Sequence, residues 1–184
     1  MNKYHYIHRY FAPDFVDYFI HVAEKHEYQR GLVINADGTV ALDEKRNCSI
    51  IPIDVLQEVM ITNQLLFMAN RLNSYFQFDI NLIREITLTM YETGGEYDWH
   101  QDVNWKEPIS QRKLTMVIQL TDPSQYDGGD LELMDCEMSE KDKAAIRDMG
   151  SVIIFPSLLK HRVTPVTRGV RKSLVTWIEG PTWR

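Results

Sequence analysis

Apolar side chains recur at helical spacing in two segments of the N-terminal half of the chain. Residues 14–28 carry apolar positions three and four apart, and Asp14, after Pro13, is placed to cap the first turn. Residues 54–74 have the same spacing over a longer stretch that begins just after Pro52. The sequence therefore predicts two amphipathic helices, the second of which packs on the outside of a sheet.

Between these two segments, short apolar stretches flank an Asp-Gly pair. Residues 32–35 and 39–42 lie on either side of Asp37 and Gly38, and Asp-Gly favours the tight turn of a β-hairpin. The charged run that follows, residues 43–47, is interpreted as a solvated loop. We expect a hairpin and then a loop before the second helix.

From residue 80 onward the apolar pattern changes from helical to alternating. Ile86, Leu88 and Met90 alternate with threonines and a tyrosine, which is typical of a strand with one buried face. Further strands are predicted at residues 113–120, 130–134, 151–155, 162–166 and 172–179, because the turn-forming residues Asp-Gly, Pro and Gly separate these segments. Helices followed by many short strands favour an α+β fold, mainly β, of the sandwich or barrel type.

Length and charge limit the range of functions. The chain has 184 residues and 44% hydrophobic content, enough for one well-buried core and short for two. Its formal net charge is -6, which argues against a broad basic surface for nucleic acid and leaves a local basic groove as the alternative. We expect a single domain over residues 1–184 and do not expect nucleic acid as a partner.

The cysteines and the apolar runs indicate a compartment. Cys48 and Cys136 are far apart and match no zinc-binding spacing, and so few cysteines are typical of a reducing environment. The longest apolar runs, such as residues 65–69, are too short to cross a bilayer. We expect a cytoplasmic protein without a membrane partner; the oligomeric state stays open.

Candidate chemistry begins with His100 and Asp102. Side chains two apart on an extended segment project to the same side, and a distant His161 would complete a face of two histidines and one carboxylate. Such a face, with its remaining positions open, is associated with non-haem Fe(II) oxygenases. Taken alone, a His-x-Asp pair is more often two solvated surface groups, so the interpretation depends on the residues that follow.

Ten residues beyond His161, Arg171 supplies a partner for such an iron site. Its planar guanidinium can hold a carboxylate with two hydrogen bonds, which suits the remote carboxylate of a keto-diacid whose other end chelates the metal. Alternation places Ser173 on the same strand face. The alternative, a surface salt bridge, fits Arg168 or Lys172 better, because Lys172 points to the other face.

Several stretches in this order resemble the 2-oxoglutarate and Fe(II)-dependent dioxygenases, and within them the prolyl 4-hydroxylase-like branch. The matching stretches are residues 89–102, 128–131, 150–156, 161–166 and 171–173. The resemblance implies a double-stranded β-helix, or jelly roll, flanked by N-terminal helices. It also implies N-terminal helical support at about residues 1–79 and a catalytic β core at about 80–184.

The resemblance further implies the cofactors and the residues that bind them. The cofactors and co-substrates are Fe(II), 2-oxoglutarate and O2, with ascorbate as an optional reductant. The implied metal ligands and catalytic residues are His100, Asp102 and His161, and the implied co-substrate contacts are Arg171, Ser173, Tyr91 and Gln119. At Gln119 the chain departs from the family, because several relatives have a tyrosine there.

The implied reaction is hydroxylation of a C–H bond with release of succinate and CO2. By analogy with the branch, the first expected substrate is a peptidyl proline or another protein residue, and the alternative is a small metabolite or free amino acid. Two other classes stay open: a non-catalytic jelly-roll binding module, and a zinc hydrolase, which would need a helix-borne glutamate.

The substrate entrance is expected to be lined by residues 103–112, which include Trp105, and by the hairpin near Asp37.

Overall fold

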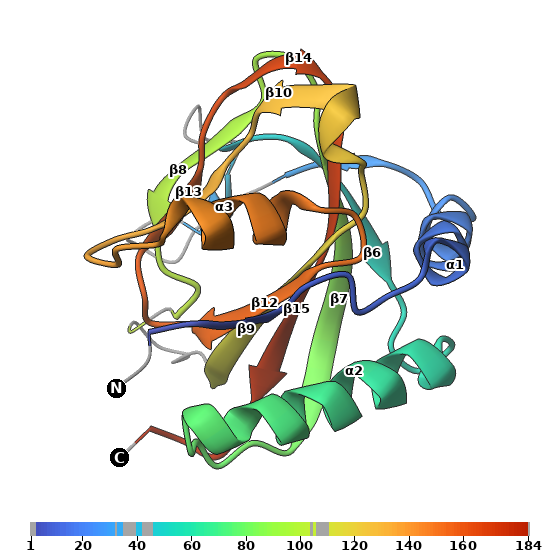
Figure 1. The fold of residues 1–184 in the computed structure, drawn as a ribbon. Helices are drawn as coiled ribbons and strands as arrows, with labels where there is room; N and C mark the ends of the chain where they lie inside the picture. Colours follow the sequence, from blue (N-terminus) through green and yellow to red (C-terminus); the bar gives the residue numbers. More distant parts are fainter. Residues whose placement is uncertain are drawn as a thin grey trace.

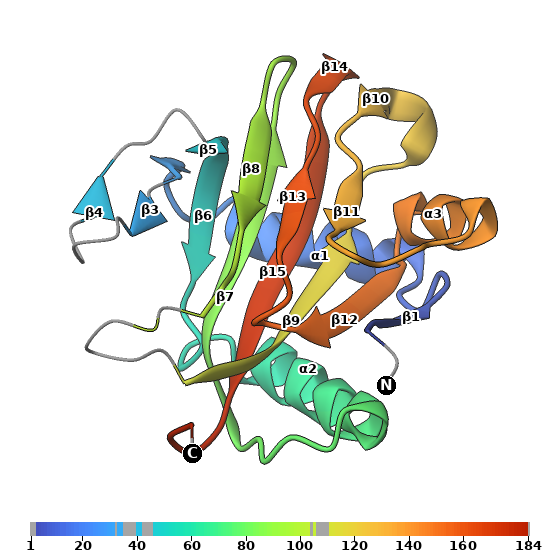
Figure 2. The same ribbon diagram turned by 90° about the vertical axis from the view of Figure 1, so that its left-hand side faces the viewer.

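The computed structural model describes residues 3–31, 33–34, 40–41, 46–103, 105 and 111–183. Two antiparallel sheets that face each other form the centre of the fold (Figure 2). The larger sheet has seven strands, in the order β1 (His5–Ile7), β12 (Val152–Pro156), β9 (Arg112–Gln119), β15 (Arg171–Glu179), β7 (Leu82–Tyr91), β6 (Ser49–Ile53) and β2 (Gln29–Arg30).

The smaller sheet covers one face of the larger one. Its order is β11 (Leu131–Leu133), β13 (His161–Val163), β8 (Glu96–His100) and β5 (Arg46–Asn47). Two further strand pairs complete the β structure: β10 (Tyr126–Gly128) with β14 (Val166–Gly169), and β3 (Val33–Ile34) with β4 (Val40–Ala41). The predicted hairpin is thus present, although its Asp37-Gly38 turn lies outside the described residues.

Helices cover the opposite face of the larger sheet. Helices α1 (Pro13–Ala23) and α2 (Val59–Leu72) lie on one side of it, and β8 and β13 lie on the other (Figure 1). A short 3-10 turn, Asn73–Tyr75, follows α2, and another, Pro123–Gln125, precedes β10. None of the helices in the described part of the chain has the length and apolar character needed to cross a bilayer.

Strand alternation gives the larger sheet two different faces. Side chains such as Leu88, Met116 and Leu174 point to the helices and form the main hydrophobic core with them. The intervening positions face the smaller sheet, and many are polar although they are buried: Thr87, Thr89, Thr115, Gln119, Arg171 and Ser173. Burying polar groups is costly unless they are paired, so the polar space between the sheets indicates a functional site.

Both predicted N-terminal helices form, but their starts differ from the prediction. The N-cap of α1 is Ala12, and Pro13 occupies the first turn, so Asp14 lies inside the helix rather than capping it. The second helix starts at Val59 because the Asp54 carboxylate accepts hydrogen bonds from the backbone N–H groups of Leu56 and Gln57, which closes a local turn instead.

Further elements differ from the sequence prediction, among them the strand β5 and a third helix. The charged run was expected to be a loop, yet Arg46 and Asn47 form β5, paired with β8; residues 43–45 lie outside the described residues. Helix α3 (Glu140–Arg147) was not predicted at all. Its start is fixed by Ser139, whose hydroxyl accepts a hydrogen bond from the backbone N–H of Asp142 at 3.1 Å.

Candidate functional site

Two strands of the smaller sheet bring His100, Asp102 and His161 together. His100 ends β8, Asp102 follows it, and His161 begins β13, where it is the direct cross-strand partner of His100. One possible ligand atom from each residue lies within 4.8 Å of the other two. The expected His–Asp–His group therefore exists in the folded chain, between the two sheets.

Backbone contacts set the orientation of both imidazoles. Nδ1 of His100 lies 2.7 Å from the carbonyl oxygen of Asp98, and Nδ1 of His161 lies 2.9 Å from that of Leu159. A carbonyl only accepts hydrogen bonds, so each Nδ1 carries a proton and Nε2 is the nitrogen that remains to bind a metal. This arrangement is the usual one for histidines that bind a metal through Nε2.

The carboxylate of Asp102 is held between the imidazoles and the hydroxyl group of Thr115. Its oxygens lie 3.7 Å from Nε2 of His100 and 3.4 Å from Nε2 of His161. The Thr115 hydroxyl donates to Oδ2 at 2.7 Å and lies 3.0 Å from the hydroxyl of Ser157. These contacts fix the carboxylate without using all its lone pairs.

The protonation states suit a cation. Burial, and then the neighbouring His161, lower the pKa of His100 to about 4, so its ring is neutral at neutral pH. Burial alone would raise the pKa of Asp102, but His161, His100, Arg112 and the hydrogen bond from Thr115 together outweigh it and hold that pKa below its usual value. Neutral imidazole and ionised carboxylate are the forms that bind a metal.

Aromatic stacking extends the site toward β5. The ring of Tyr97 stacks on that of His100, with centroids 3.5 Å apart, and the Arg46 guanidinium carbon lies 4.9 Å from the Tyr97 centroid. Arg46 also donates through Nε to the sulfur of Cys48 at 3.3 Å. Sequence reasoning missed this arginine because the charged run around it was interpreted as a solvated loop.

Arg171 lies at the other end of the same polar space. It is only 3% exposed, it is the cross-strand partner of Tyr91, and its guanidinium carbon lies 5.6 Å from the Tyr91 ring centroid. Nη1 of Arg171 is buried and has no hydrogen-bond partner among the described residues. An uncompensated buried cation is costly, so this atom fits an anion that binds there.

The chain thus fits the groups that its sequence implies. Two imidazoles and a carboxylate form a donor set that suits Fe(II), and a buried guanidinium whose Nη1 has no partner among the described residues suits the remote carboxylate of 2-oxoglutarate. Ser173 is buried on the same face as Arg171 and is paired across the sheet with Thr89 and Gln119. The individual roles of Tyr91, Ser173 and Gln119 stay predictions.

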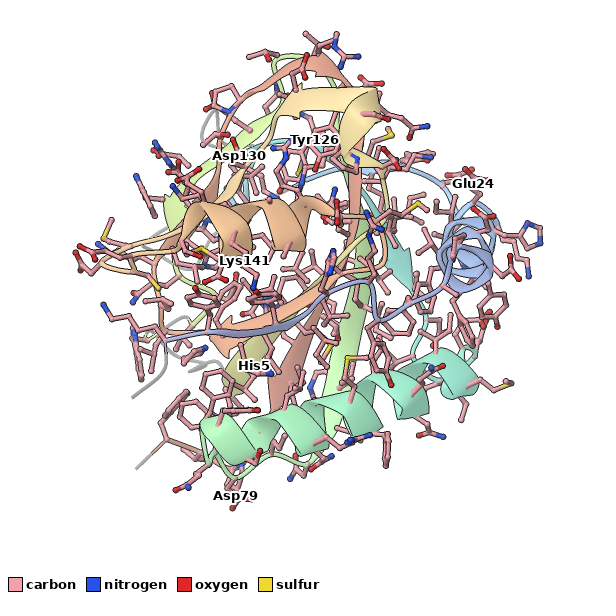
Figure 3. The ribbon with its side chains drawn as sticks, viewed as in Figure 1. His5, Glu24, Asp79, Tyr126, Asp130 and Lys141 are labelled. Atoms are coloured by element: carbon pink, nitrogen blue, oxygen red, sulfur yellow. The ribbon has the colours of Figure 1, made fainter. Side chains whose placement is uncertain are left out.

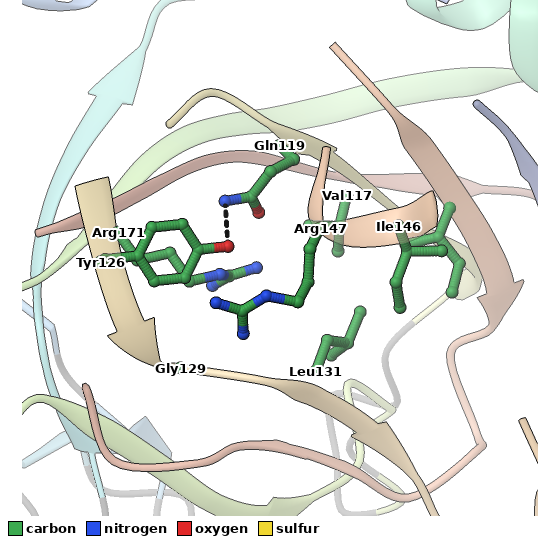
Figure 4. A pocket seen from close by; sticks show the side chains of 9 residues that line it. Val117, Gln119, Tyr126, Gly129, Leu131, Ile146, Arg147 and Arg171 are labelled. Carbon is green, nitrogen blue, oxygen red and sulfur yellow. Dashed lines mark hydrogen bonds between the residues drawn. The ribbon is translucent and has the colours of Figure 1, made fainter. Parts of the chain in front are cut away.

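Sequence reasoning missed two residues beside Arg171. Arg171, Gln119, Tyr126 and Arg147 line one pocket, together with Val117, Gly129, Leu131, Ile146 and Ile153 (Figure 4). Tyr126 comes from β10 and Arg147 from α3. The only local signal was the nearby Gly128-Gly129 turn, because contacts between such distant elements leave no trace in a single sequence.

Other expected features have simpler roles. Nζ of Lys172 lies 3.6 Å from Oε1 of Glu24, and Nε of Arg168 lies 2.6 Å from Oδ2 of Asp127. Both residues therefore form the surface ion pairs expected of them. Asp130, within the stretch 128–131 that resembles the family, pairs with Arg147.

The expected substrate segment is described only at its ends. Trp105 is 52% exposed, and its ring centroid lies 5.7 Å from that of Trp183. Val103 is buried, and residues 104 and 106–110 lie outside the described residues.

Two buried polar atoms in the larger sheet, Oγ1 of Thr87 in β7 and Nε1 of Trp177 in β15, have no partner among the described residues.

The chain is similar in sequence to known hydroxylases. It is 32% identical over 139 residues to a PKHD-type hydroxylase from Synechococcus sp., a match that covers 73% of this chain and 60% of the relative. A PKHD-type hydroxylase from Colwellia psychrerythraea is 37% identical over 100 residues, covering 53% of this chain and 41% of the relative. The chain therefore spans about 60% or less of the length of these relatives.

Solved structures share the fold. A Pseudomonas putida prolyl-4-hydroxylase superposes with a TM-score of 0.72 at 21% identity, covering 99% of this chain and 95% of that one. A Trichoplax adhaerens prolyl hydroxylase, in complex with a hypoxia inducible factor peptide fragment, superposes with a TM-score of 0.69 at 14% identity. This match covers 97% of this chain and 84% of that one. The predicted double-stranded β-helix is confirmed.

The sequence profile of one family spans the strands that carry the site. Residues 86–179 match the 2OG-Fe(II) oxygenase superfamily. This range begins within β7 and ends with β15, so it includes the His–Asp–His group and Arg171. The chain belongs to the 2OG-Fe(II) oxygenase superfamily.

Proposed function

We propose that this chain is an Fe(II)- and 2-oxoglutarate-dependent dioxygenase that hydroxylates a C–H bond and releases succinate and CO2. One observation carries the proposal: a largely buried His–Asp–His group shares the space between the sheets with Nη1 of Arg171, which has no partner among the described residues. Metal donors at one end and a carboxylate-binding group at the other are what a chelating keto-diacid requires.

In this proposal, His100, Asp102 and His161 bind Fe(II), and Arg171 binds the remote carboxylate of 2-oxoglutarate. When bound, iron, 2-oxoglutarate and O2 supply the oxidising chemistry, and the protein supplies binding and orientation. Thr115 holds Asp102, while the carbonyls of Asp98 and Leu159 hold the imidazoles. The surrounding sheets exclude bulk water, which limits side reactions.

The proposed substrate is a peptidyl proline or another protein residue. Two findings support it: curated relatives are PKHD-type hydroxylases, and one protein with the same fold was solved with a peptide. The exposed ring of Trp105 offers an apolar contact in the segment expected to line the entrance. A small metabolite or free amino acid is the second candidate.

We also propose a single domain over residues 1–184, with N-terminal support up to about residue 79 and a catalytic core from about residue 80. Packing of α1 and α2 on the core of the larger sheet supports this division, although β1, β2 and β6 of the N-terminal part join that sheet as well. Two unpaired cysteines fit the proposed cytoplasmic location.

An anaerobic Fe(II) titration with and without 2-oxoglutarate tests the proposal. The oxygenase should develop a visible metal-to-ligand charge-transfer band only when both are present. A non-catalytic binding module or a zinc hydrolase should give no such band. A band without succinate formation in air, across proline-containing peptides and free amino acids, would leave the binding site intact and refute the proposed substrates.

A further inference from the structure

Gln119 occupies the position where several relatives have a tyrosine, yet a phenol hydroxyl is present beside it. Tyr126 is 1% exposed, and Nε2 of Gln119 donates to its hydroxyl oxygen at 3.0 Å (Figure 4). The phenol comes from β10, outside the larger sheet, and reaches the pocket that Arg171 lines. The chain therefore presents a tyrosine hydroxyl in this pocket from a different strand.

The ring of Tyr126 is also held on its face. The guanidinium carbon of Arg147 lies 4.6 Å from the ring centroid, in a cation–π contact. Arg147 is itself fixed, because Nη1 donates to the carbonyl of Gly128 at 2.8 Å and pairs with the carboxylate of Asp130. Tyr126 and Asp130 lie on the same side of α3 (Figure 3).

Two hydrogen-bond donors in this pocket are left unused. A phenol can accept hydrogen bonds and donate one; Gln119 uses an acceptor position of Tyr126, and the described residues offer no acceptor for the Tyr126 proton. Nη1 of Arg171 likewise has no partner there. Buried donors are normally satisfied, so an acceptor that binds here would engage both.

We propose that Tyr126 is a second binding residue for the remote carboxylate of 2-oxoglutarate, beside Arg171, with Gln119 and Arg147 as positioning residues. This inference rests on the proposed function. Arg171 supplies charge and Tyr126 supplies a neutral donor to the same carboxylate, so Gln119 acts through the phenol rather than on the co-substrate. Asp130 balances the charge of Arg147, which leaves Arg171 as the main attraction for the anion.

The experiment compares two ligands that differ only at the remote end. 2-Oxoglutarate and 2-oxopentanoate share the chelating keto-acid, but 2-oxopentanoate has a methyl group in place of the remote carboxylate. Anaerobic calorimetry on the full chain with Fe(II) gives the affinity ratio between them. Tyr126→Phe removes only the hydroxyl and should reduce the preference for 2-oxoglutarate roughly 10-fold or more, as expected for a hydrogen bond to a charged group.

Tyr18→Phe, on the exposed side of α1, is the matched control and should leave the ratio unchanged. If circular dichroism shows that Tyr126→Phe does not fold, Gln119→Leu is tested in its place. This change should lower the preference for 2-oxoglutarate about 3-fold, because the phenol loses the hydrogen bond that orders it. An unchanged ratio in the folded variant, with a lost preference in Arg171→Ala, overturns the role of Tyr126 and leaves the proposed function standing. A wild-type chain that binds both ligands equally refutes the proposed function itself and this inference with it.

Discussion

His161 lies directly opposite His100 across the β13–β8 pair, and their ring centroids are 4.2 Å apart. The register of two antiparallel strands sets this distance, because directly paired residues place their side chains next to each other. The carboxylate of Asp102 contacts both rings. The sheet thus fixes the two imidazoles, and Asp102, just beyond the end of β8, is held by its contacts with both rings and with the Thr115 hydroxyl.

Removing any of these three side chains should abolish iron binding and turnover. Loss of a supporting partner around a metal typically costs about 10- to 100-fold in affinity, so loss of a ligand in His100→Ala, Asp102→Ala or His161→Ala should cost more than about 100-fold. Anaerobic Fe(II) titration and succinate release measure the two effects. Retention of iron affinity and turnover in all three variants would refute the metal assignment.

Thr115→Val tests the support of the carboxylate. The change keeps the shape of the side chain but removes the hydroxyl that donates to Asp102, so Fe(II) affinity should fall by roughly 10- to 100-fold. Thr176→Val is the matched control, because this buried threonine on β15 donates to the backbone carbonyl of Glu85 instead. Equal losses of iron affinity in the two variants would indicate a general effect on the sheets.

Arg171→Ala should leave Fe(II) binding nearly intact and weaken 2-oxoglutarate binding. Losing a desolvated, charge-assisted contact costs on the order of 2 to 4 kcal/mol, or roughly 30- to 1000-fold in affinity. Arg171→Lys should recover only part of the lost 2-oxoglutarate affinity, because lysine lacks the planar guanidinium group. Ser173→Ala should weaken 2-oxoglutarate binding by about 1 kcal/mol. Anaerobic calorimetry that finds wild-type affinity in Arg171→Ala would place the carboxylate elsewhere.

The stability of the metal-free protein should fall as the pH drops from about 6.5 to about 4. The pKa of His100 is about 4 in the folded state, against about 6.5 in the unfolded chain. In this window the unfolded state binds more protons, so the free energy of unfolding decreases as the pH falls, by on the order of 2 to 4 kcal/mol for this residue.

Denaturant titrations with a chelator present, at several pH values, measure this slope. His100→Gln should have a shallower slope between pH 6.5 and 4, while both proteins share the contribution of their carboxylates at lower pH. Identical slopes would mean that His100 is not buried in its neutral form.

The sequence was most informative where side-chain identity and local spacing suffice. Spacing of two on an extended segment placed His100 and Asp102 together, and strand alternation correctly put Arg171 and Ser173 on one buried face. These predictions need only local geometry and one family pattern.

Prediction failed where long-range pairing decides the structure. The charge of Arg46 suggested solvent, but pairing with β8 places its guanidinium over Tyr97. Tyr126 and Arg147 reach the pocket of Arg171 only because β10 and α3 pack there. Helix α2 starts late because the Asp54 carboxylate competes for backbone N–H groups, a competition that helical periodicity does not reveal.

Trp105→Ala should separate substrate binding from co-substrate chemistry. The ring is half exposed and packs on Trp183 at the described end of the segment expected to cover the substrate. Its loss should therefore reduce hydroxylation of a bound substrate more than it reduces uncoupled 2-oxoglutarate decay, because Arg171 and the metal donors are untouched. Phe67→Ala on α2, also an exposed aromatic residue, should change neither rate. Succinate release with and without substrate measures both rates, and equal losses in Trp105→Ala would assign the ring a structural role against Trp183.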